Sequence, residues 1–221
     1  MSKRRFLKFS FKILFLSLFK VNLVSYAIEK LNPKRKTLVF THPFFLKKVF
    51  LNNHPEQPQR ITKIISELNN QKLENLIEKI NLNVLVDYWI SKIHSEIHID
   101  SLKKNHPLAE NMSRIAIKGC IQAVDKIMER KIKNAFCLSR PPGHHALNTG
   151  KDEGFCFYNH IAVVTKYIQL KYKIKKILII DWDYHHGNST ELFFYDDPTV
   201  LFFSTHNLEA YPGTGFPKRK G

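Results

Sequence analysis

The stretch KKILIIDWDYHHGNST, residues 175–190, joins an apolar run to two aspartates and two histidines. Its first half is rich in isoleucine and leucine, which is typical of a strand buried in a sheet. The polar side chains that follow are costly to remove from water, so they are unusual beside a buried strand. In a parallel sheet, however, ligands bind in the loops at the carboxyl ends of the strands. The stretch therefore predicts a fold class and a place for chemistry.

The flanking sequence alternates between strand-like and helix-like segments. Such alternation across residues 113–206 predicts an α/β fold with a parallel sheet covered on both faces. A short apolar run at 84–90 indicates a strand or an edge segment. We expect strands at 36–40, 134–139, 175–183 and 199–206, and helices at 61–80, 113–130, 159–172 and 189–197, the last opened by Ser189 or Thr190.

Three polar loops follow three of these expected strands. They are RPPGHHA at 140–146, DWDYHHG at 181–187 and STHNLEAYPGTG at 204–215. Because the carboxyl ends of parallel strands lie at one edge of a sheet, we expect the three loops to converge there. This convergence carries more weight than any of the motifs alone.

Asp183 and His185 are the first candidates for metal binding. In an extended segment, residues two apart project to the same face, so a carboxylate oxygen and an imidazole nitrogen reach a common point. A borderline metal such as zinc accepts both donors. Asp181 shares that face and is placed to orient a histidine. The alternative is a helix N-cap followed by a hydrogen-bonded turn.

His144 and His145 follow two prolines and a glycine, which favour a stiff, sharply turned loop. Two adjacent histidines are poorly placed to bind one ion together. They are better suited to flank a water molecule as general base and electrostatic partner. The alternative is a pair of surface histidines in a turn. For Phe155, in the next loop, two positions are possible, in the wall of a substrate channel or in the core. The sequence pattern alone does not distinguish them.

Composition limits the classes of function. Of the formal net charge of +16, residues 1–50 carry +11, from 12 Lys or Arg and one acid, so no basic stripe remains for specific nucleic-acid binding.

Residues 1–27 have a basic start, a short apolar run and small residues before Ala27, the layout of a secretory signal. They predict export or membrane contact, with a cytoplasmic location as the alternative. Three cysteines, Cys120, Cys137 and Cys156, lack metal or disulfide spacing and are expected as buried free thiols.

Several stretches together resemble the zinc-dependent histone deacetylase family, and its class II, acetylpolyamine amidohydrolase and acetoin-utilisation branches above all. The resemblance implies a three-layer arginase/deacetylase-like α/β fold with a mainly parallel sheet. It extends from about residue 38 to the end of the chain. The matching stretches are 54–60, 93–102, 134–146, 154–163, 177–206 and 211–215.

The resemblance also implies roles for individual residues. Asp183 and His185 match zinc ligands, and His144 and His145 match the tandem histidines that act on the zinc-bound water. Asp181 would hold His144, and Asn188 would hold His145. Phe155 matches a wall of the acyl-lysine tunnel, and Arg60 matches the acetate-release region. A structural monovalent-cation site, usually for K⁺, is matched by Asp181, Asp183, His185, Ser204 and Thr205.

Such enzymes hydrolyse an acetyl amide, here of the acetyl-lysine or acetylpolyamine type, without a covalent intermediate. The family's third zinc ligand, an aspartate, and its oxyanion-binding tyrosine have no counterpart up to Gly221. We therefore expect residues 36–221 to form the N-terminal two-thirds of a catalytic domain, with the fold incomplete on its C-terminal side. The alternative is a non-catalytic remnant of that fold. Glu110 is the weak counterpart of the family's substrate-gripping aspartate.

Overall fold

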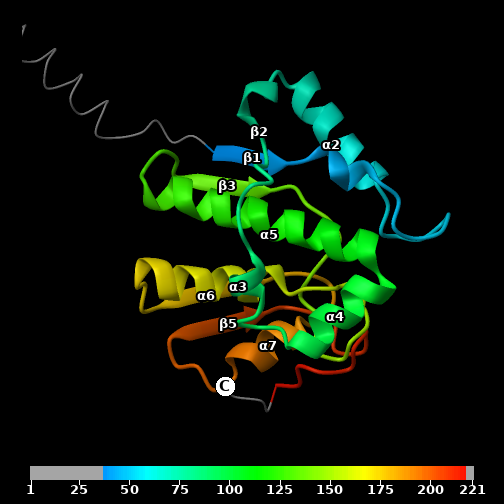
Figure 1. Cartoon of the computed structure of the whole chain (residues 1–221), viewed down its shortest axis with the longest axis vertical. Helices are drawn as coiled ribbons and strands as arrows, with labels where there is room; N and C mark the ends of the chain where they lie inside the picture. The colour runs from blue at the N-terminus through cyan, green and yellow to red at the C-terminus, as the bar shows by residue number, and fades with distance from the viewer. Residues whose placement is uncertain (1–36, 218–221) are drawn as a thin grey trace, which may run out of the picture.

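The computed structural model describes residues 37–217 as a layered arrangement of parallel strands and helices (Figure 1). The strands are β1 Thr37–Thr41, β2 Ile77–Lys79, β3 Asn134–Cys137, β4 Ile177–Asp181 and β5 Val200–Ser204. The α-helices are α2 Gln59–Asn70, α3 Asp87–Ile90, α4 Glu96–Asn105, α5 Pro107–Met128, α6 His160–Tyr172 and α7 Asn188–Phe194, with two 3₁₀ turns, Pro43–Leu46 and Glu74–Leu76.

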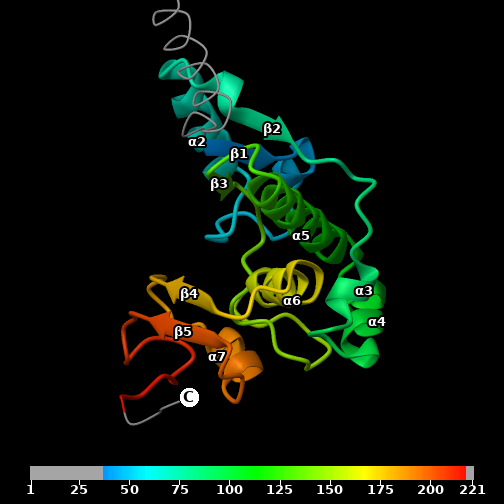
Figure 2. The same ribbon diagram turned by 90° about the vertical axis from the view of Figure 1, so that its left-hand side faces the viewer.

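The strands form two sheets, and β1 to β5 pair only in parallel, with one isolated antiparallel bridge between Glu153 and Cys156 in a loop. One sheet has the order β2-β1-β3, and the other pairs β4 with β5. The predicted α/β class with parallel strands is confirmed. The described strands form two sheets and not the single parallel sheet that was predicted, because β3 pairs with β1 and not with β4. Figure 2 shows α5 against the first sheet and α6 beside the second.

Helix α5 lies between two hydrophobic cores. Its Met112, Ile115 and Ala116 pack with β1 and Phe45 in the first core. Its Ile117 and Ile121 point the other way, into a second core built from α3, α4, α6, α7, β4 and β5. A helix in a two-sided layer must be apolar on two faces, which explains why its buried residues cover a broad arc.

The helix predicted at 61–80 is correct only in its first part. Helix α2 ends at Asn70, and Lys72 then adopts a left-handed conformation with φ +56°. The chain continues as a 3₁₀ turn and enters β2. The apolar residues of this second part pack as a parallel edge strand on β1, and helical spacing did not reveal the break.

Three other element predictions are also corrected. Residues 84–90 hold the short helix α3, because a short apolar run does not distinguish a strand from a helix. Helix α5 begins at Pro107, not near Ser113, and proline is favoured at the first helical position. Helix α7 begins at Asn188 after Gly187, and the predicted caps, Ser189 and Thr190, are buried inside it.

The predicted leader, residues 1–27, lies outside the described residues. Among the helices of residues 37–217, none is long and apolar enough to cross a bilayer. The three cysteines are free as predicted, and Cys156 is fully buried whereas Cys120 and Cys137 are half-buried.

Candidate active site

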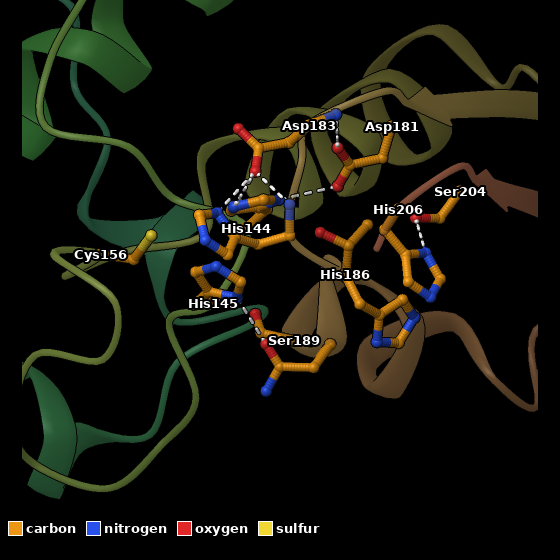
Figure 3. Close-up of polar contacts among 12 residues, drawn as sticks. His144, His145, Cys156, Asp181, Asp183, His186, Ser189, Ser204 and His206 are labelled. Atoms are coloured by element: carbon orange, nitrogen blue, oxygen red, sulfur yellow. Dashed lines mark hydrogen bonds and ion pairs between the residues drawn. The ribbon is translucent and has the colours of Figure 1, made fainter. Parts of the chain in front are cut away.

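The three polar loops meet at the carboxyl ends of β3, β4 and β5, as predicted (Figure 3). The Ser189 amide donates to the carbonyl of His144 at 3.1 Å, which joins the loop after β3 to the start of α7. The Asn207 amide donates to the carbonyl of Tyr184 at 3.0 Å, which joins the loops after β4 and β5. Backbone hydrogen bonds therefore fix the relative positions of all three loops.

Asp183 and His185 lie side by side in the loop after β4. The Asp183 carboxylate accepts a hydrogen bond from the His185 amide at 2.7 Å, and its Oδ1 lies 3.1 Å from Nδ1 of the His185 ring. The loop is bent rather than extended, so this side-chain-to-backbone turn, not strand alternation, brings the pair together. The short distance between the two side chains was expected from both hypotheses, the metal site and the hydrogen-bonded turn.

The spacing of this pair fits two ligands of one tetrahedral zinc ion. Ligand atoms at ordinary zinc distances lie about 3.3 Å from each other, and here the two atoms are 3.1 Å apart. Both side chains are partly exposed, at 49% for Asp183 and 42% for His185, so an ion could reach them. Across residues 37–217, no cluster of three or more His, Cys, Asp or Glu side chains is arranged to hold a metal. The pair therefore offers two ligands to an ion.

Each tandem histidine is held by its own hydrogen-bond acceptor. Nδ1 of His144 lies 2.9 Å from Oδ2 of Asp181, and Nδ1 of His145 lies 2.8 Å from Oδ1 of Asn188. The two rings are 4.0 Å apart, and Nε2 of His144 is 3.8 Å from Asp183. Figure 3 shows His144 close to Asp183. Both Nε2 atoms are therefore left available on the side of the loop after β4.

Two of these groups have displaced pKa values. Burial, and then the neighbouring His144, lower the pKa of His145 to about 4, so this ring is neutral at pH 7. Burial alone would raise the pKa of Asp181, but its hydrogen bond with His144 and the charge of that ring outweigh burial and lower the pKa. The site thus holds an ionised Asp181 hydrogen-bonded to His144, and a neutral ring at His145.

A cavity of about 720 Å³ opens beside these groups. Its walls include both tandem histidines, the Asp183–His185 pair and two predicted residues of the substrate path, Phe155 and Arg60. Phe155 is 36% exposed and not a core residue, which resolves the open choice in favour of the cavity wall. Gly154 is required there, because a Cβ on it would lie 2.5 Å from Cδ2 of His145 and 2.9 Å from the Tyr211 ring.

The residues matched to the monovalent-cation site also lie together. Asp181 pairs with Ser204 in the register of β4 and β5, and the Thr205 amide donates to the carbonyl of Asp181 at 3.0 Å. The Ser204 hydroxyl lies 2.8 Å from Nδ1 of His206. The structure places these three residues at one point of the sheet edge, next to Asp183.

Tyr211 is an aromatic cavity residue that was not among the predicted site residues. Its ring stands edge-on to His145 at 4.9 Å and forms part of the cavity wall. Tyr211 lies in the loop 204–215 that was expected at the site edge, so a tyrosine in that loop was a usable signal. Tyr211 is not the later tyrosine that the resemblance implies.

Glu110 does not occupy a substrate-facing position. It is 5% exposed and forms hydrogen bonds with Arg114 and, at 2.8 Å, with the Tyr158 hydroxyl. The interpretation of Glu110 as a weak counterpart of the substrate-gripping aspartate is therefore wrong.

Comparison with known proteins gives consistent results. The histone deacetylase domain model matches residues 54–221. A "Probable deacetylase" of Archaeoglobus fulgidus is 32% identical over 203 residues, covering 84% of this chain and 55% of that protein. "Histone deacetylase 6" of Caenorhabditis elegans is 34% identical over 76% of this chain and 20% of its own length. "Histone deacetylase clr3" of Schizosaccharomyces pombe is 30% identical over 75% of this chain and 29% of its own length.

The fold agrees with a solved structure as well. The crystal structure of the HDA15 HD domain superposes with a TM-score of 0.74 at 29% identity, covering 83% of this chain and 58% of that one. The chain thus spans about half the length of the A. fulgidus protein, and less of the two eukaryotic relatives. It has the α/β fold of the arginase/deacetylase type, and the chain belongs to the histone deacetylase domain family.

Proposed function

We propose that this chain provides the site for zinc-dependent hydrolysis of an acetyl amide. One observation carries the proposal. A carboxylate–imidazole pair spaced for two zinc ligands faces two histidines, each of which is oriented by a separate acceptor. The membership of the family supports hydrolytic deacetylation in general. Zinc, the roles of the residues and the substrate are our inference.

The chain's own residues would divide the work as follows. Asp183 and His185 would hold the ion, which when bound supplies polarisation of the amide carbonyl and a lower pKa for a water molecule. His145, neutral at pH 7, would accept a proton from water at Nε2, because Asn188 occupies Nδ1. His144, whose Nδ1 is held by the ionised Asp181, would act as the electrostatic partner that stabilises developing negative charge.

The walls of the cavity favour a neutral acyl chain as substrate. Phe155 and Tyr211 contribute aromatic surface to the wall, and an acetylated lysine or an acetylated polyamine carries an apolar stem that such surface would contact. Arg60, in the same wall, would attract the acetate that hydrolysis releases. Asp181, Ser204 and Thr205 would position a K⁺ ion that stiffens the base of the loop after β4.

A second candidate function is a non-catalytic domain of the same fold. It is favoured by the two-ligand character of the site, since residues 37–217 hold no larger metal-binding cluster. Catalytic zinc sites ordinarily use three protein ligands. The two candidates differ in what they predict for zinc and for turnover.

Titration calorimetry with zinc and an acetate-release assay on an acetyl-lysine peptide test the proposal together. We expect one zinc ion per chain in the unaltered protein and none in His185→Ala, because a single carboxylate remains. The matched control is His106→Gln, which also removes a histidine but lies at the α4–α5 junction. Zinc binding with measurable acetate release supports the enzyme, and zinc binding without release supports the second candidate. Equal zinc binding in His185→Ala and the unaltered chain would contradict the site.

A further inference from the structure

Two buried histidines, His94 and His98, lie outside the cavity. His94 follows α3, and His98 lies in the first turn of α4. Their rings stack at 5.0 Å with an interplanar angle of 24°, and they are 2% and 0% exposed. Neither is among the cavity residues. Burying two imidazoles side by side is costly unless each ring nitrogen has a partner.

Both nitrogens of His94 contact the loop formed by residues 146–159. Nε2 accepts a hydrogen bond from the Asn159 amide at 2.9 Å, and Nδ1 lies 3.0 Å from Oδ1 of Asn148. A backbone N–H can only donate, so Nε2 must be unprotonated. The proton of the neutral ring is therefore on Nδ1 and is donated to Asn148.

His98 holds the same loop with the opposite tautomer. Its Nδ1 accepts from the Gly150 amide at 3.0 Å, which leaves the proton on Nε2. That proton is donated to the carbonyl of Phe157 at 2.9 Å. A protonated ring at either position would direct an N–H at another N–H. Burial accordingly lowers the pKa of His94 to about 3 and lowers the pKa of His98.

The loop held in this way carries the cavity wall. Glu153 and Cys156 exchange backbone hydrogen bonds of 3.1 and 2.9 Å, and between them lie Gly154 and Phe155, both in the wall. Phe155 adopts φ +68°, a conformation disfavoured for a bulky residue and maintained by its surroundings.

The same contacts extend to the tandem histidines. Asn159 donates from Nδ2 to the Ser189 hydroxyl at 2.7 Å, and Ser189 donates to the carbonyl of Ala146 at 2.7 Å. The Ser189 amide holds the carbonyl of His144. A continuous chain of hydrogen bonds therefore runs from His94 to the backbone of the candidate catalytic loop.

We propose that His94 and His98 are positioning residues for the loop 146–159. As neutral rings of opposite tautomer, they hold this loop, with its Gly154 and Phe155, against the tandem histidines. The inference rests on the proposed function in that this loop walls the proposed substrate cavity. It assigns a task to two histidines that touch neither the cavity nor the metal-ligand pair.

Substitution of each histidine by both glutamine and asparagine tests the tautomers in the metal-free full chain. A glutamine can place an oxygen near the position of Nε2, and an asparagine can place one near Nδ1. His94→Gln should therefore keep the acceptor for the Asn159 amide, and His94→Asn should lose it. At the second site the order reverses, so His98→Asn should keep the acceptor for the Gly150 amide and His98→Gln should lose it.

Amide hydrogen exchange followed by NMR gives the readout. We expect exchange about tenfold faster at Asn159 in His94→Asn and at Gly150 in His98→Gln, matching the loss of one hydrogen bond. The faster exchange should spread to Glu153 and Cys156, with Phe40 in β1 unchanged as the internal control. Equal behaviour of the Gln and Asn variants at both sites would overturn the tautomer assignment.

Two further outcomes would overturn the positioning role. One is unchanged exchange at Glu153 and Cys156 when Asn159 or Gly150 is released. The other is a uniform rise that includes Phe40, which would indicate a general effect on stability. Because the measurement needs neither zinc nor turnover, its failure is distinct from failure of the proposed function.

Discussion

The three-stranded and two-stranded sheets use similar sequences in different surroundings. The central strand β1 is apolar, and four of its five residues are buried. Strands β4 and β5 are more apolar than β1, yet their residues alternate between buried or partly buried and exposed. On the outer face, Leu178 and Ile180 lie opposite Leu201 and Phe203, and each of the four is more than half exposed.

The comparison shows that an apolar run specifies a strand but not how many of its faces are covered. Strands buried on both faces ordinarily give continuous apolar runs, and β4 has such a run while one face meets solvent in residues 37–217. The candidate site takes Asp183 and His185 from the loop after β4 of this less covered sheet, and His144 and His145 from the loop after β3 of the other. Stability and chemistry are therefore expected to respond differently to changes in the two sheets.

The largest contrast should come from one phenylalanine in each sheet. Phe40 in β1 is 0% exposed, and Phe203 in β5 is 54% exposed. Phe40→Ala should lower the free energy of unfolding by about 4 kcal/mol, because it leaves a cavity in the first core. Phe203→Ala should cost less than about 1 kcal/mol. Urea denaturation measures both, and similar losses would show that the outer face of β5 is covered in solution.

The buried ion pair of Arg140 and Glu56 should give the next largest effect. Both side chains are at most 2% exposed, and the guanidinium also donates to the carbonyls of Phe45 and Lys47. Glu56→Ala should cost about 3 kcal/mol, because it leaves a buried charge without its partner. The double variant Glu56→Ala with Arg140→Met should recover part of this loss. A double variant less stable than the single one would contradict the explanation.

Neighbouring isoleucines of β4 provide a contrast inside the two-stranded sheet. Ile179 is 6% exposed and faces the second core, and Ile180 is 52% exposed on the outer face. Ile179→Ala should cost about 2–3 kcal/mol, and Ile180→Ala less than about 1 kcal/mol. Thermal melting of the two variants measures the difference. Reversal of the order would mean that the register of β4 is wrong.

The smallest effect should come from Asp197, which links α6 to the start of β5. Its hydrogen bonds with Lys166, at 2.8 Å, and Thr199 hold its pKa well below the usual value. Asp197→Asn should lower stability by about 0.5–1 kcal/mol at pH 7. The native advantage is fully present above the unfolded-state pKa of about 3.9 and is lost as the pH falls further. A difference that stayed constant from pH 7 to pH 2 would contradict the ion pair.

Much of the site could be predicted from sequence because its residues are local to strand ends. Asp181 and Asp183 follow β4, and His144 and His145 follow β3. The two strands belong to different sheets, but the loops at their carboxyl ends meet, as expected for ligand-binding loops of an α/β fold. The sequence placed the loop of Tyr211 at the site edge but not the side chain itself, because its position depends on the path of a long loop after β5. Glu110 was misplaced for a related reason, since spacing along the chain does not show which face of α5 is buried.

The fold was predictable where one pattern dominated and failed where two competed. The apolar residues of 61–80 satisfy helical spacing throughout, yet a left-handed residue at Lys72 and pairing with β1 convert the second part into a strand. Tertiary pairing outweighs local propensity there. The separation of β3 from β4 was also beyond sequence reasoning, because the order of strands in a sheet is not encoded in any one segment.

Helix α5 has a thermodynamic consequence, since it belongs to both cores at once. Melting of the helix would remove buried side chains from both cores, so the packing of each half depends on the same element. Scanning calorimetry should therefore show a single endotherm, with calorimetric and van 't Hoff enthalpies that agree. A molecule with two separate sheets should in this respect unfold as one cooperative unit.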